Sequence, residues 1–214
     1  MIGPQLERLR VGVRPAANRL LVSLLGVVLL ALLILQIASA VLFALLSFNV
    51  SLPAGPIFDL VHPVHFFVGF VLIPLVLLKL MSTGWKFVMY YLGSRAYHEV
   101  GPPDWPARLI APLFVVSSIV LLGSGIEMWS FLNQFIGFWT QVHLIASVGF
   151  VGSLIAHLVF HARHAHRDAA ADLAPATVER PAERGQLTRR AVVGGGLLLG
   201  AGLAISAANW PFPA

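Results

Sequence analysis

The chain has 214 residues, a net charge of +5, 58% hydrophobic residues and only 11% charged residues. Its mean hydropathy of +0.86 excludes an ordinary water-soluble domain and calls for several membrane spans. In so apolar a chain the basic residues set orientation in the membrane, and we expect no nucleic-acid partner. The absence of cysteine excludes disulfides, cysteine-ligated iron–sulfur clusters and covalently attached haem, so a redox cofactor must be held without sulfur.

Five apolar segments, each long enough to cross a bilayer, follow one another along the chain. The predicted spans are residues 20–48, 61–81, 108–129, 139–161 and 189–208. The polar segments around them are a basic lead, a Pro/Gly loop, an aromatic-rich loop, a short turn, a charged linker and a tail, at 1–19, 49–60, 83–107, 130–138, 162–188 and 209–214. The first half of the aromatic-rich loop is a candidate interfacial helix. We expect residues 20–161 to form a four-span bundle, with the fifth span as an anchor.

The Lys and Arg residues predict the orientation of these spans. Of the 14 Lys and Arg residues, all but Lys79 lie in the basic lead, at the connection of the second and third spans, or after the fourth span. Basic residues accumulate on the cytoplasmic side of membrane proteins. We therefore expect a cytoplasmic N-terminus and, after five spans, a C-terminus outside.

Two histidines lie inside the fourth predicted span, His143 near its start and His157 fourteen residues later. Fourteen residues at about 100° each make nearly four full turns, so both imidazoles lie on one helix face, about 21 Å apart along the axis. That separation approaches the depth of the hydrocarbon core, about 30 Å. A titratable residue inside a span is costly, and both histidines are therefore candidate functional residues.

The second predicted span runs in the same direction and carries His65 about four residues from its start, as the fourth span carries His143. Imidazole is a common axial ligand of haem, and cofactors bind between the helices of a bundle. We therefore expect His65 and His143 to ligate one haem b at the outer level. His62, one turn earlier, is the substitute ligand, although it also fits a plain interfacial histidine.

At the inner level, the residue fourteen positions after His65 is Lys79 rather than a histidine, at a depth similar to that of His157. Three interpretations of Lys79 remain open. It snorkels to the cytoplasmic interface, pairs with a haem propionate, or ligates a second haem opposite His157. The chain would accordingly hold one haem b or two. Arg108, at the start of the third span, is a candidate propionate partner or a plain anchor of the span end.

Each histidine also has a purely structural interpretation, because an imidazole in a span often hydrogen-bonds to a neighbouring helix. The repeated spacing of residues 65 and 79 and of residues 143 and 157 favours haem over that interpretation. The later run of His157, His161, His164 and His166 is interleaved with arginines. We interpret it as a solvated basic flank rather than a metal site.

The histidines, with LMSTGWKFVMYYLGSRAYHEVGPP (80–103) and RLIAPLFVVSSIVLLGSGI (108–126), resemble bacterial cytochrome b561-type haem membrane subunits. The pattern is most similar to the membrane part of actinobacterial sulfite-oxidase-like molybdopterin oxidoreductases, over roughly residues 60–161. LTRRAVVGGGLLLGAGLAIS (187–206) is similar to a twin-arginine export segment. The resemblance implies an all-α fold in the bacterial plasma membrane, with a four-helix haem-binding bundle plus a fifth transmembrane helix.

The function expected from these patterns is electron transfer by a membrane b-type cytochrome. It would pass electrons between membrane quinone and an extracytoplasmic redox partner, a molybdopterin-type enzyme or a respiratory complex. Because no catalytic domain follows the last span, we expect an electron-transfer subunit of an oxidoreductase rather than a catalyst on its own. The alternative is a non-redox membrane anchor or assembly subunit of a larger complex, with structural histidines.

Overall fold

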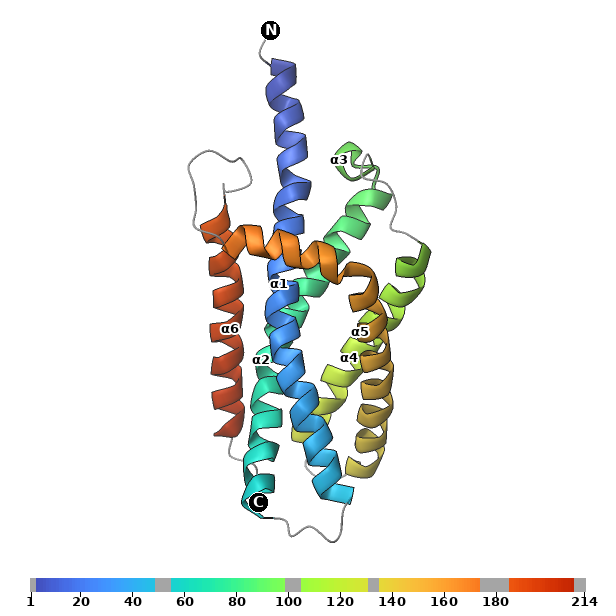
Figure 1. The fold of residues 1–214 in the computed structure, drawn as a ribbon, viewed down its shortest axis with the longest axis vertical. Helices are drawn as coiled ribbons and strands as arrows, with labels where there is room; N and C mark the ends of the chain where they lie inside the picture. The colour runs from blue at the N-terminus through green and yellow to red at the C-terminus, as the bar shows by residue number, and fades with distance from the viewer. Residues whose placement is uncertain (1–2, 49–54, 99–104, 131–134, 174–184, 210–214) are drawn as a thin grey trace. The chain divides into compact units, whose positions relative to one another are not determined.

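The computed structural model describes residues 3–48, 55–98, 105–130, 135–173 and 185–209. Every regular element in these ranges is a helix: α1 (Gly3–Phe48), α2 (Pro56–Tyr91), α3 (Arg95–His98), α4 (Trp105–Ser130), α5 (Ile136–Leu173) and α6 (Gln186–Ala208) (Figure 1). All except the short α3 contain a segment long and apolar enough to cross a membrane, which makes five spans. The prediction of an all-helical protein with five spans is confirmed.

Several helices extend beyond the predicted spans. The segment predicted as an interfacial helix after the second span is the unbroken end of α2, and α5 continues to Leu173, into the segment predicted as a linker. Alanine is the best helix former, and the alanine-rich sequence after residue 160 favours this continuation. The length of a helix that leaves the bilayer is thus set by helix propensity rather than by hydropathy.

A glycine turn ends α2. The backbone N–H of Gly93 donates to the Tyr90 carbonyl, and that of Ser94 donates to the Met89 carbonyl. This pair of bonds is a Schellman motif, which requires a left-handed residue after the last helical turn. Gly93 supplies it with a φ of 74°.

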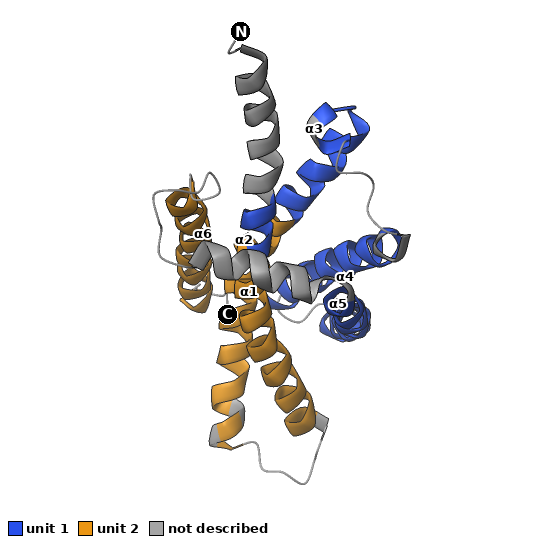
Figure 2. Cartoon of the chain, turned by 45° about the horizontal axis from the view of Figure 1, so that its top comes forward, with its two compact units in different colours: residues 1–23, 80–184 blue, residues 24–79, 185–214 orange. Residues whose placement is uncertain are grey.

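The chain forms two compact units (Figure 2), one of residues 1–23 and 80–184 and the other of residues 24–79 and 185–214. In the second unit, the membrane segments of α1 and α2 pack together with α6. Their aliphatic core includes Leu25, Leu29, Leu33, Val68, Leu72 and Leu75. The last span, predicted as an anchor, is α6 of this unit.

A stripe of small side chains on α6 allows that packing. The buried positions of α6 include Val193, Gly196, Gly200, Ala204 and Ala207, a spacing of three to four residues that places them on one helix face. Small residues let membrane helices approach closely. The backbone of α6 therefore lies directly against α2.

In the first unit, α4 and α5 pack as an antiparallel pair. Ser117 of α4 lies against Gly149 of α5, and the rings of Phe114 and Phe150 stack with centroids 5.1 Å apart. Buried serines line this helix pair, and their hydroxyls bond back to carbonyls one turn earlier, as in Ser118 and Ser153. Such back-bonding satisfies a serine hydroxyl within an apolar span.

Candidate haem-binding site

His65 lies on α2 with its ring against α1. The Oγ of Ser39 lies 3.2 Å from His65 Nδ1, and the same hydroxyl donates to the backbone carbonyl of Gln36 at 2.9 Å. The Gln36 amide nitrogen lies 3.2 Å from each ring nitrogen of His65. Two polar side chains one turn apart on α1 therefore hold this imidazole inside the membrane segment.

The Gln36 amide also reaches the far side of the ring. Its nitrogen is within hydrogen-bonding distance of His65 Nε2, the nitrogen that does not face Ser39. Its Oε1 is buried and has no hydrogen-bond partner among the described residues. Gly69 of α2 packs beside this amide, since a Cβ there would be in ordinary contact with Gln36 Nε2 at 3.5 Å.

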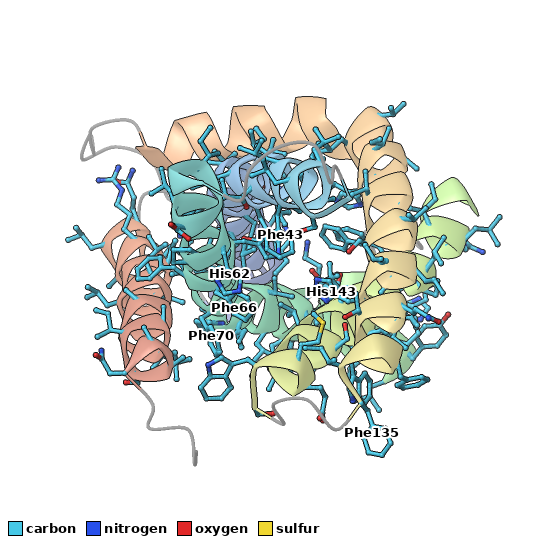
Figure 3. The ribbon with its side chains drawn as sticks, turned by 90° about the horizontal axis from the view of Figure 1, so that it is seen from below. Phe43, His62, Phe66, Phe70, Phe135 and His143 are labelled. Atoms are coloured by element: carbon cyan, nitrogen blue, oxygen red, sulfur yellow. The ribbon has the colours of Figure 1, made fainter. Side chains whose placement is uncertain are left out.

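Aromatic rings surround His65 and connect it to His62. Phe43 of α1 stacks on His65 with an interplanar angle of 14° and also contacts His62, with ring centroids 5.7 Å apart. His62 in turn packs on Phe66 at 4.7 Å, and Figure 3 shows Phe43, His62 and Phe66 close together. The His62 side chain is exposed, whereas that of His65 is half-buried. His65 is therefore the better placed of the two to serve as an interior ligand.

His143 lies on α5 and faces α4. The Oγ of Ser124 lies 3.0 Å from His143 Nδ1 and donates to the Leu121 carbonyl at 3.1 Å. Ser124 is only 1% exposed. A Cβ built on Gly125 would lie 3.4 Å from His143 Cε1, so the ring packs closely against the α4 backbone. A serine and a glycine that are neighbours in the sequence thus fix this imidazole.

The two residues predicted at the inner level have different surroundings. His157 on α5 stacks on Phe114 of α4, with ring centroids 5.4 Å apart and an interplanar angle of 7°. Lys79 on α2 is half-buried and places its ammonium against α1, 3.1 Å from where a Cβ of Gly26 would lie. Aromatic stacking thus holds His157, and a glycine gap on α1 accommodates Lys79. The three interpretations of Lys79 remain open.

The remaining predicted residues lie at or beyond the span ends. Arg108 is exposed where the membrane segment of α4 begins. The side chains of His161, His164 and His166 lie outside the described residues. In the part of the chain that the structure describes, no three or more His, Cys, Asp or Glu residues form a group suited to a metal ion. A haem iron needs only two axial side chains, which is a smaller requirement.

Sequence reasoning missed the residues that hold the histidines, namely Gln36, Ser39, Phe43, Ser124 and Phe114. One of them had a usable signal, because Gln36 is the only amide in the first span and a polar residue in a span suggests function. The serines carried no such signal, since other buried span serines, such as Ser118 and Ser153, form described hydrogen bonds only to their own helix.

Comparisons with known proteins identify no relative. No family model, curated protein or solved structure matches the chain.

Proposed function

We propose that this protein is a membrane b-type cytochrome that relays electrons between membrane quinone and an extracytoplasmic redox partner. His65 and His143 are the axial ligands of one haem b in this proposal. One observation supports it above the others. Inside two apolar spans, each of these imidazoles is held at Nδ1 by a serine on a neighbouring helix of its own unit, at 3.2 Å for His65 and 3.0 Å for His143.

The residues present fit haem. A histidine that ligates a metal through one nitrogen almost always uses the other to bond an oxygen acceptor, which fixes the ring orientation. Ser39 and Ser124 supply that oxygen at Nδ1, which assigns Nε2 to the iron. At His65 the Gln36 amide, 3.2 Å from Nε2, would have to move aside for a ligated iron. Bound haem would supply the one-electron chemistry. The chain would supply two axial imidazoles and an apolar setting in which no covalent thiol is needed.

The place of the two histidines along their spans favours a relay at the outer face. Each lies near the start of a span predicted to run inward, the membrane segments of α2 and α5. Quinone dissolves in the bilayer and would deliver electrons from within it. A haem at this level would pass them to a partner outside, and the inner residues His157 and Lys79 would not take part.

Reduction of the purified protein by a soluble quinol analogue, followed by stopped-flow absorbance, tests this proposal. The wild-type protein should develop a reduced b-type spectrum, and His65→Ala and His143→Ala should lose it. His98→Ala is the matched control, because His98 stacks on Tyr90 outside the predicted spans. Wild-type protein that contains haem but is not reduced by quinol would contradict the quinone step.

A further inference from the structure

We infer that Ser39 and Ser124 are positioning residues that fix the tautomer of His65 and His143, with the ring proton on Nδ1 and the lone pair on Nε2. The inference rests on the proposed function only where it concerns iron, because the tautomer itself is a property of the chain.

The inferred direction of each serine–histidine hydrogen bond starts from the bond that the serine makes to its own helix. A serine hydroxyl has one proton, and a backbone carbonyl can only accept. The hydroxyl of Ser39 donates to the Gln36 carbonyl at 2.9 Å, and that of Ser124 donates to the Leu121 carbonyl at 3.1 Å. While each hydroxyl donates to the carbonyl of its own helix, the serine oxygen can only accept from the imidazole. This arrangement places the ring proton of His65 and His143 on Nδ1, the nitrogen that faces the serine.

The arrangement occurs twice, on different helix pairs. Ser39 on α1 holds His65 on α2, and Ser124 on α4 holds His143 on α5. A serine that bonds to its own helix does not by that alone contact a histidine. Buried Ser118 and Ser153 also donate to carbonyls of their own helices, and they form no described bond to a histidine. The histidines that share this arrangement are the two that sequence spacing assigned to one haem level.

The arrangement has consequences for a ligated metal. A hydrogen bond from Nδ1–H makes the imidazole a stronger donor through Nε2 and prevents the ring from rotating. Loss of the serine oxygen should make Nε2 a weaker donor and allow the ring to rotate. We expect the ring to sample both tautomers, the haem to be held less tightly and its midpoint potential to rise.

The test is ¹⁵N NMR of histidine-labelled protein, recorded with and without haem, together with haem retention and midpoint potential. Wild-type protein should show the Nδ1–H form at His65 and His143. Ser39→Ala and Ser124→Ala should lose that form at the facing histidine and weaken haem retention by about 10- to 100-fold. Ser118→Ala is the matched control and should change neither, whereas Ser39→Thr and Ser124→Thr keep the hydroxyl and should restore both.

Two results would overturn the inference: an Nε2–H form at either wild-type histidine, or a tautomer that the serine-to-alanine variants leave unchanged. Failure of the proposed function would look different. Protein without haem that nevertheless shows the serine-dependent Nδ1–H form would support the role of the serines and contradict the haem.

Discussion

Gly200 of α6 lies directly against the backbone of Val71 in α2. A Cβ built on Gly200 would lie 2.7 Å from both the Cα and the carbonyl oxygen of Val71. Real Cβ atoms do not approach other atoms so closely, and a helix backbone cannot yield as the end of a side chain can. The contact between these two helices therefore requires glycine at this position.

Gly200→Leu should separate α6 from α2 and destabilise the protein. Overpacking usually costs about 1–3 kcal/mol, and we expect the upper end because the obstructing atoms are backbone. Thermal unfolding in detergent measures the effect as a lower Tm. Gly202→Leu is the matched control, because a Cβ there meets no atom within 4 Å. Equal Tm values for the two variants would contradict the close packing of α6.

Gly125→Val should displace the imidazole of His143. An added Cβ lies 3.4 Å from His143 Cε1, which an alanine would tolerate, but the branches of valine need the space that the ring occupies. We expect less haem per protein in the valine variant, measured by absorbance after purification. Gly123→Val serves as the control, since nothing lies within 4 Å of its Cβ. Full haem content in Gly125→Val would argue against His143 as a ligand.

His157→Ala and Lys79→Met should keep the haem, because the proposal places one haem at the level of His65 and His143. His157→Ala also removes the stacking on Phe114 and should therefore lower Tm modestly. Haem content and Tm are measured on the same samples to separate the two effects. If His157→Ala lost half of the haem, a second haem at the inner level would be required.

The orientation of the spans can be tested by chemical labelling, because the chain contains no cysteine. Phe135→Cys lies between α4 and α5, where the side chain is 68% exposed, and His98→Cys lies in α3. The distribution of basic residues predicts that position 135 is outside and position 98 is in the cytoplasm. A membrane-impermeant maleimide added to intact cells should label only Phe135→Cys. The reverse pattern would invert the topology and place the predicted outer level inside.

The sequence predicted the spans because a bilayer imposes long apolar segments that are visible in composition. The spacing of His143 and His157 was equally readable, since helix geometry converts it directly into a shared face. The partners of the histidines were not predictable. Which serine meets His65 or His143 depends on which helices pair and in what register, and the sequence leaves both undetermined.

The helix surface that α6 packs against was not predictable from the sequence either. Gly196 and Gly200 are four residues apart, a spacing suited to close helix contact, but the sequence analysis did not single them out. Nothing in the sequence identified Val71 on α2 as the surface that they meet. The extension of α5 to Leu173 was missed for a different reason, because hydropathy ends where helix propensity continues.

The most direct test of the central claim is a dithionite-reduced minus oxidised absorbance spectrum of the purified protein, with a pyridine haemochrome count of haem per chain. The proposal predicts a b-type spectrum and one haem b per chain, lost in both His65→Ala and His143→Ala. Purified protein that is folded but colourless would contradict it, and would leave the chain as a membrane anchor whose histidines serve only to hold its helices together.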